Sequence, residues 1–146
     1  MSAESNTEAA RRIVEEGFSQ GRLEVFDEVC GPDYVSHDPA EEEDVQGIEA
    51  HKERCAGYRT AMSDFKVTVD GVFGSGDLVA MRWSVQGTND GELAGMPATG
   101  RQVAFTGMSI DRFDAGGKLV ETWDQWDNAG FMQQLGVSAE AVDEAG

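Results

Sequence analysis

The hydrophobic periodicity of the chain changes near Asp64, and this change constrains the fold more than any other feature. Before Asp64, apolar residues recur at helical spacing, which is typical of helices with one buried face. After it, apolar and polar residues alternate, as in β-strands that bury one side. Helices followed by a run of strands indicate an α+β fold rather than alternating α/β units.

The first half of the chain predicts three helices. Ser5 and Glu8 have the spacing of a capping box, which places the start of the first helix at Ser5, and Gly21 ends that helix. The predicted helices span residues 5–21, 22–30 and 48–62. Between the second and the third, the segment Tyr34 to Pro39 is expected to be extended, and the acidic run after it is expected to be a loop.

The second half predicts an antiparallel sheet. The expected strands span residues 65–70, 78–86, 102–113 and 118–127. Glycine-rich segments between them suit tight hairpins, and consecutive hairpins make neighbouring strands antiparallel. We therefore expect residues 1–146 to form a single domain, in which a strongly curved sheet wraps three helices around a cone-shaped cavity. A short helix is expected after Asp127, and residues 137–146 are expected to fray as an acidic tail.

The charge balance limits the partners of the chain. Its 28 acidic residues against 11 basic ones give a formal net charge of −17. Such a surface repels phosphate backbones and anionic lipids, so neither nucleic acid nor a membrane is an expected partner. The composition resembles that of proteins from a high-salt, halophilic cytoplasm, where counter-ions screen the repulsion. No apolar segment is as long as a membrane span, so the expected location is the cytoplasm.

The two cysteines predict no chemistry. Cys30 and Cys55 lie in segments predicted to be helical, and they lack the short spacing of metal ligands. We expect both to be buried, reduced and inert, with no bound metal.

The end of the last predicted strand carries the main functional lead. Asp124 lies between Trp123 and Trp126, and its strand parity is that of Trp126. A carboxyl held against aromatic surface is poorly hydrated, which raises its pKa toward the range useful for general acid/base catalysis. If this face lines the cone, Asp124 is a buried acid; otherwise it is a solvated edge residue. For Asp127, which precedes the last helix, N-capping is the expected role.

Further candidates surround this acid. His37 lies in the extended segment beside Tyr34 and either orients a substrate carbonyl as a second catalytic residue or is a structural histidine. His51 lies on the apolar face of its helix, where a core role is expected. The chain carries more aromatic and methionine surface than a helix–sheet interface requires, which predicts an apolar pocket. The candidate substrate-binding residues of this kind are Tyr34, Tyr58, Met62, Trp83, Met96, Phe105, Trp126 and Phe131.

Four motifs occur in order in the last third of the chain, beginning at Gly87. They are GT-x-x-GEL-x-G-x-P-x-TG, G-x-x-x-x-RF, GK-x-VE-x-W and D-x-x-G-x-x-QQLG, and YVSHDP at residues 34–39 precedes them. Together with the order of the elements, they resemble the SnoaL-like polyketide cyclases, also called ester cyclases, of the NTF2-like superfamily. The resemblance covers essentially the whole chain.

The resemblance implies a cofactor-free ring closure. In the cyclases of this family, an aspartate near the end of the final strand is the general acid/base of an intramolecular aldol condensation, and alignment places it at Asp124. The sequence also departs from the family: Asn89 and Ser109 stand where histidines are common. Ser109 either donates a hydrogen bond to a substrate oxygen or is a small core residue.

Three functions remain open from the sequence. The first is a cofactor-independent cyclase, lyase or isomerase that acts on a small hydrophobic carbonyl compound. The second is a hydrolase that adds water to a small apolar substrate such as an epoxide. The third is a non-catalytic ligand-binding module. A homodimer packed through the outer sheet face is also expected, with candidate contacts at Val72, Val85, Val103 and Val120.

Overall fold

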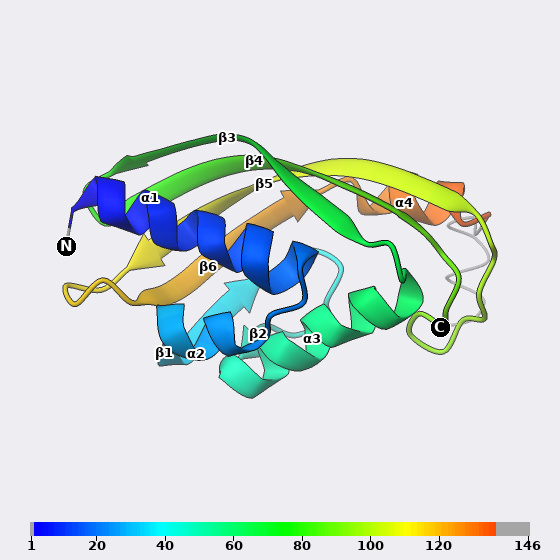
Figure 1. The fold of residues 1–146 in the computed structure, drawn as a ribbon, viewed down its shortest axis with the longest axis horizontal. Helices are drawn as coiled ribbons and strands as arrows, with labels where there is room; N and C mark the ends of the chain where they lie inside the picture. Colours follow the sequence, from blue (N-terminus) through cyan, green and yellow to red (C-terminus); the bar gives the residue numbers. More distant parts are fainter. Residues whose placement is uncertain (1, 137–146) are drawn as a thin grey trace.

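A computed structural model describes residues 2–136 and confirms the α+β fold. Figure 1 shows a curved sheet that arches over the helices, with α1 and α3 beneath it and α4 at one end. The helical elements are α1 (Ala3–Arg12), η1 (Ile13–Ser19), α2 (Glu24–Val29), α3 (Ile48–Ala61) and α4 (Asn128–Gln134). The strands are β1 (Cys30–His37), β2 (Val45–Gln46), β3 (Lys66–Ser75), β4 (Leu78–Thr88), β5 (Gln102–Phe113) and β6 (Leu119–Trp126).

The first helix begins earlier than predicted and changes its winding. Ser2 is its N-cap, and the Ser2 side chain accepts a hydrogen bond from the Ser5 backbone N–H at 3.1 Å, so the predicted capping box at Ser5 is wrong. From Ile13 to Ser19 the chain continues as the π-helix η1. Gly17 of this segment lies against the Phe26 ring, where a Cβ atom would come within 3.3 Å of the ring edge. The absence of a Cβ atom at Gly17 therefore lets η1 pack closely against α2.

The six strands have the order β2-β1-β6-β5-β4-β3. Strands β3 to β6 form the predicted antiparallel hairpins, but β1 pairs with β6 in parallel, so the expectation of a purely antiparallel sheet is wrong. The reason is the connection: β1 and β6 are separated by α3 and four strands, and a long crossover permits a parallel pairing that a hairpin does not. This pairing places the extended segment around Tyr34 beside the strand that carries Asp124.

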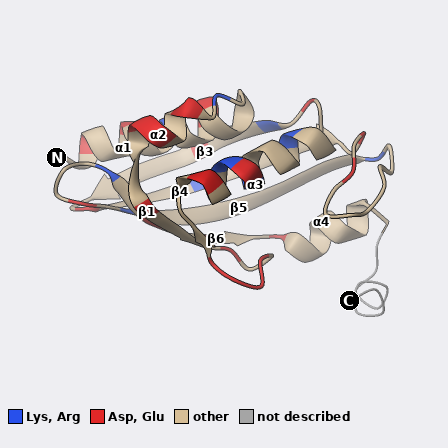
Figure 2. Ribbon diagram, turned by 90° about the horizontal axis from the view of Figure 1, so that it is seen from below, with Lys and Arg blue, Asp and Glu red and all other residues tan. Residues whose placement is uncertain are grey.

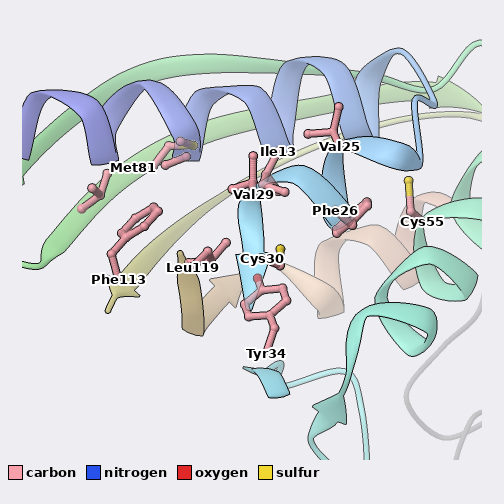
Figure 3. Close-up of a cluster of buried hydrophobic side chains, with 12 residues drawn as sticks. Ile13, Val25, Phe26, Val29, Cys30, Tyr34, Cys55, Met81, Phe113 and Leu119 are labelled. Carbon is pink, nitrogen blue, oxygen red and sulfur yellow. The ribbon is translucent and has the colours of Figure 1, made fainter. Parts of the chain in front are cut away.

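Two clusters of buried hydrophobic residues form the core. One lies among α1, η1, α2 and the neighbouring strands, and Figure 3 shows part of it, with Phe26 and Tyr34 among its aromatic members. The other lies under the opposite half of the sheet and includes Phe105 and Phe131. Val14, Phe18 and Trp83 pack against both clusters. The two clusters are therefore bridged by shared side chains in the middle of the molecule.

Both cysteines are buried and unpaired, although Cys30 begins a strand instead of ending a helix. Burial raises the pKa of the Cys55 thiol to about 11, which keeps it protonated and unreactive at neutral pH. The predicted acidic tail lies outside the described residues. No helix within residues 2–136 is long and apolar enough to cross a lipid bilayer.

Acidic residues are distributed over the molecule. Figure 2 shows them on the helices and on loops at both ends of the sheet, with few basic residues between them. Because the acids are not gathered in one segment, no single strongly negative tail dominates the described surface. The repulsion expected from a net charge of −17 is spread over the fold.

Candidate functional site

A cavity of about 100 Å³ lies between the helices and the inner face of the sheet. Its wall joins residues of both core clusters and is mainly apolar, with a small group of polar side chains. The lining residues are Ile13, Val14, Phe18, Tyr34, Arg54, Tyr58, Phe65, Val67, Met81, Trp83, Val85, Phe105, Ser109, Asp111, Thr122, Asp124 and Trp126. A site of this kind suits an apolar ligand that carries a few polar atoms.

Two neighbouring strands supply the polar centre of the cavity. On β5, Ser109 and Asp111 face inward, and on β6, Thr122 and Asp124 face inward. The register places Ser109 opposite Asp124 and Asp111 opposite Thr122. Each strand therefore contributes one hydroxyl and one carboxyl, and each carboxyl faces the hydroxyl of the other strand.

The carboxyl of Asp124 is held by a chain of hydrogen bonds. The Ser109 hydroxyl donates to Asp124 Oδ1 at 2.6 Å, and the Trp83 indole N–H donates to the Ser109 Oγ at 2.8 Å. Only 13% of the Asp124 side chain is exposed. Burial raises the pKa of Asp124, while the positive charge of Arg54 and the Ser109 hydrogen bond oppose this rise.

A glycine on β5 leaves the space that these hydrogen bonds of Trp83, Ser109 and Asp124 require. Gly107 lies two residues before Ser109 on β5. A Cβ atom at Gly107 would lie 2.5 Å from the Trp83 ring and 2.8 Å from Trp126 Cβ. Both distances are shorter than any side chain tolerates, so only glycine leaves room for the Trp83 indole at this point. The position of the indole in turn orients the Ser109 hydroxyl, whose hydrogen then points toward Asp124.

Asp111 has a different environment. The Thr122 hydroxyl donates to Asp111 Oδ1 at 2.6 Å. A hydroxyl has one hydrogen to donate, so in the 2.7 Å contact between Tyr34 and Thr122 the Tyr34 hydroxyl is the donor and Thr122 Oγ1 the acceptor. Asp111 forms no ion pair within the part of the chain that the structure describes, and 7% of the residue is exposed. Burial raises the pKa of Asp111 to about 7, despite the opposing hydrogen bond from Thr122.

Arg54 supplies the positive charge at the cavity wall. Its Nη1 atom lies 3.1 Å from Asp38 Oδ2 and 4.0 Å from Asp124 Oδ2. The other Asp38 oxygen accepts the Trp126 indole N–H at 2.9 Å. The Asp38 side chain is 5% exposed and the Arg54 side chain 11%, so this is a buried ion pair that extends toward Asp124. Among the described residues, Arg54 Nε is the buried side-chain N or O atom left without a hydrogen-bond partner.

His37 lies outside the cavity, which corrects the expectation that it acts beside Asp124. Its ring nitrogens lie 2.7 Å from Glu121 Oε2 and 2.9 Å from Asp44 Oδ1, and the ring stacks on Trp123. These partners raise the pKa of His37, with Glu121 the largest cause. The physical reason for the correction is strand parity: Tyr34 and Ser36 of β1 are buried inward, so His37 faces the other side of the sheet.

Three of the predicted substrate-binding residues also lie away from the cavity wall. Met62 is buried against Gly87 at the end of α3, and Met96 lies in the loop between β4 and β5. Phe131 of α4 packs on the rings of Phe105 and Trp126 and so stands behind the wall. The other predicted residues do line the cavity: Tyr34, Tyr58, Trp83, Phe105, Ser109 and Trp126.

His51 has the core role expected of it. It is fully buried, its Nδ1–H donates to the Gly47 carbonyl at 2.7 Å, and its Nε2 atom lies 2.7 Å from the Ser36 hydroxyl, which donates to it. Burial lowers the pKa of His51 to about 4, so the ring is neutral. Its ring stacks on Tyr34 with centroids 4.0 Å apart, which fixes the tyrosine that reaches Thr122.

The family model described as SnoaL-like polyketide cyclase matches residues 8–135.

The chain belongs to the SnoaL-like polyketide cyclase family.

Solved structures agree with this assignment. A candidate polyketide cyclase from Acidithiobacillus ferrooxidans is 32% identical with a TM-score of 0.79, and the match covers 92% of this chain and 97% of that one. IdmH, a candidate polyketide cyclase from Streptomyces antibioticus, is 31% identical with a TM-score of 0.74, over 90% and 99%. A candidate SnoaL-like cyclase from Jannaschia sp. CCS1 has a TM-score of 0.83 at 24% identity, over 91% and 92%, and shares the fold. No curated protein sequence matches the chain.

Three polar residues that line this SnoaL-like cavity, and Asp38 beside it, were not predicted from the sequence. Strand parity was a usable signal for two of them, since Asp111 shares the face of Ser109, and Thr122 shares the face of Asp124. Arg54 follows His51 by three positions, so helical spacing also placed it on the buried face. Asp38 gave no signal, because its partners come from α3 and β6. Within residues 2–136, no group of three or more His, Cys, Asp or Glu side chains is arranged to hold a metal ion.

Proposed function

We propose that this protein is a cofactor-independent cyclase or isomerase that acts on a small hydrophobic carbonyl compound, with Asp124 as the general acid/base. The observation that carries the proposal is the Asp124 carboxyl itself. It lines an apolar cavity, it is 13% exposed, and its pKa is raised by burial. A carboxylate in such a place is a stronger base than one in water and can return the proton that it takes.

The proposed reaction needs only the side chains at the cavity wall. Asp124 Oδ2 takes the proton from a carbon next to a carbonyl, and the electron pair of that C–H bond forms an enolate. The enolate carbon attacks a second carbonyl of the same molecule, which forms a C–C bond and an alkoxide. Asp124 then returns its proton to the alkoxide. In an isomerisation, Asp124 returns the proton to a different carbon instead.

Two contacts support a base at Asp124. Ser109 binds Oδ1 at 2.6 Å, which leaves Oδ2 as the oxygen that meets the substrate. Arg54 lies 4.0 Å from Oδ2 and favours the ionised form that the first step requires.

The aromatic side chains of Tyr58, Phe105 and Trp126 line the cavity and favour an apolar substrate. The solved relatives from Acidithiobacillus ferrooxidans and Streptomyces antibioticus, described as candidate polyketide cyclases, support the same reaction class.

The test is hydrogen–deuterium exchange at the α-carbon of a hydrophobic ketone. 2-Tetralone is incubated with the protein in D₂O, and the loss of its α-proton signals is followed by NMR. We expect catalysed exchange with the natural chain and its loss in Asp124→Asn, while saturation-transfer NMR still detects binding. Glu121→Gln is the matched control, because it removes a carboxyl from the same strand but from the outer face.

Each outcome decides the proposal. Equal exchange in the natural chain and Asp124→Asn would remove Asp124 as the base. Binding of the ketone without exchange in the natural chain would favour a non-catalytic binding protein. Incorporation of ¹⁸O from labelled water into an epoxide such as styrene oxide would favour the hydrolase.

We also propose that two copies associate through the outer sheet face. The expected contacts need correction, because Val85 and Val103 are buried in the core and Val72 packs against it. The outer face instead exposes Phe73, Leu78, Met108, Ile110 and Trp123, which is an apolar surface suited to a partner. Light scattering should show a dimer for the natural chain and a monomer for Ile110→Glu.

The cytoplasmic location stays a proposal as well, supported by the free, buried cysteines. Fractionation of the source cells checks it: recovery of the protein in the cytoplasmic fraction is the expected result, and recovery outside the cell would contradict it.

A further inference from the structure

We propose that Asp111 is a second catalytic residue, which donates a proton to the carbonyl oxygen of the substrate while Asp124 takes a proton from the neighbouring carbon. This inference rests on the proposed function, since it assigns the acid that works with the base Asp124. It replaces a single carboxyl that serves both roles by two carboxyls with separate roles.

The geometry of Asp111 fits a donor. Its Oδ1 atom accepts the Thr122 hydroxyl at 2.6 Å, whereas Oδ2 has no hydrogen-bond partner within the described part of the chain. Asp111 lines the cavity, so Oδ2 is the oxygen that can carry a proton toward a ligand. The Tyr34 hydroxyl donates to Thr122 and fixes the direction of the Thr122 hydrogen. The free oxygen and the bound oxygen of Asp111 are therefore distinguished before any substrate arrives.

The two carboxyls lie at a useful separation. Asp111 is opposite Thr122, and Asp124 is two residues farther along β6 on the same face, so the two acids are diagonal neighbours. Such neighbours have Cβ atoms roughly 7 Å apart. A carbonyl oxygen and its α-carbon fit between two such carboxyls, with one in hydrogen-bond reach of the oxygen and the other of the α-proton.

The charges around the two acids push them toward different protonation states. Asp124 faces Arg54 of α3 at 4.0 Å, which favours its ionised form, while the charge of Asp38 has a smaller opposite effect. The titratable groups that face Asp111 are Asp124 on β6 and the Tyr34 hydroxyl and Cys30 thiol on β1. Burial raises the pKa of both β1 groups, so neither carries charge at neutral pH. With no cation beside it, Asp111 keeps its proton to higher pH than Asp124.

The apolar residues that line the rest of the cavity do not alter the difference in proton affinity between Asp111 and Asp124. Ile13 of η1 and Met81 of β4 line the same cavity and bring no charge to it. A pair of acids whose surroundings separate their proton affinities is the arrangement expected of one base and one acid. Burial accordingly raises the pKa of Asp111 to about 7.

The step balances without a further reactant. Asp124 takes the α-proton as the C–H bond breaks, the electron pair forms a C=C bond, and the carbonyl oxygen takes the proton of Asp111 to give a neutral enol. The enol carbon then bonds to a second carbonyl carbon of the same molecule. The new alkoxide takes the proton from Asp124, and Asp111 takes back the enol proton. Both acids end in their starting states, and no enolate charge develops in the apolar cavity.

The experiment measures 2-tetralone exchange in D₂O across the range from about pH 5 to about pH 9. The natural chain should show a rate that rises as Asp124 ionises and falls as Asp111 loses its proton. Asp111→Asn should lower the maximum by about 100-fold and abolish the fall at high pH. Thr122→Val removes the hydrogen bond that favours ionised Asp111, so the falling limb should move to higher pH. Thr122→Ser keeps the hydroxyl and should keep the natural profile.

The outcomes separate this inference from the proposed function. No exchange with the natural chain defeats both. Exchange that Asp124→Asn abolishes, but that Asp111→Asn leaves unchanged in rate and profile, overturns only the role of Asp111. If Asp111→Asn fails to fold, the threonine pair decides: an unshifted falling limb in Thr122→Val, equal to that of Thr122→Ser, rules out Asp111 as the titrating acid.

Discussion

The buried carboxyl of Asp111 should make the stability of this protein depend on pH in a way that one substitution removes. Its pKa of about 7 in the folded state compares with an ordinary value of 3.8. Between these two values the folded chain holds the proton and the unfolded chain has released it, so the free energy of unfolding falls as pH rises through this window. A difference of about three pH units corresponds to about 4 kcal/mol.

The perturbation is Asp111→Asn, which keeps the shape of the side chain and its acceptor for Thr122 but cannot ionise. Below about pH 4 the variant and the natural chain should differ by less than about 1 kcal/mol, since both groups are then neutral. Above about pH 8 the variant should be more stable, by up to about 4 kcal/mol, because only the natural chain then contains a buried charge without a cation.

Urea unfolding at a series of pH values measures this difference by linear extrapolation to water. Groups distant from Asp111, such as His37, are common to both proteins and cancel in the difference. Asp124 interacts with Asp111 through its charge, so the change in its titration is part of the measured difference. Asp33→Asn, at an exposed position of β1, controls for the loss of one negative charge. A difference between Asp111→Asn and the natural chain that stays constant from acid to alkaline pH would refute the argument that burial holds the proton on this carboxyl.

Four further outcomes are expected. Arg54→Met should lower the free energy of unfolding by about 3–5 kcal/mol, because it leaves the buried Asp38 carboxylate unpaired. Arg11→Gln removes an exposed ion pair and should lower it by less than about 1 kcal/mol, and urea unfolding compares the two variants. His51→Gln should reduce the loss of stability on acidification. The pKa of His51 is lowered to about 4, so the natural chain loses up to about 3 kcal/mol of unfolding free energy as pH falls from about 6.5 toward 4. Equal acid profiles of the two proteins would contradict this. Gly107→Ala should displace the Trp83 indole and lower the exchange rate of 2-tetralone, with a change in near-UV circular dichroism; an unchanged spectrum would show that the ring tolerates a Cβ 2.5 Å away. The melting temperature should rise between dilute buffer and multimolar salt, because counter-ions screen the net charge of −17, and a melting temperature independent of salt would contradict that account.

Strand parity explains why part of the site was predictable. Period-two alternation in a single strand assigns its residues to two faces, so Asp124 and Trp126 could be placed together from the sequence. The same rule, applied to β5, would have found Asp111 beside Ser109. The rule does not say which face is inward, and for that reason His37 was expected in the cavity and several valines on the outer face. Burial by the helices decides the face, and the helices are distant in sequence.

Contacts between distant elements were beyond such reasoning. The partners of Arg54 come from the end of β1 and from β6, and the parallel pairing of β1 with β6 depends on a crossover through most of the chain. Local periodicity does not identify which strands pair across about eighty residues, because many such pairings satisfy the same alternation.

The amino-acid order by itself determined the class of the fold, the sequence of its helices and hairpins, the acidic surface and the carboxyl on the last strand. These properties follow from spacings of a few residues, which neighbouring side chains impose on the backbone. Only the tertiary structure decided that two carboxyls share one cavity, that Arg54 stands beside Asp124 and not beside Asp111, and that His37 faces away. Proton affinity depends on burial and on charges a few ångströms distant, and those neighbours are brought together by packing.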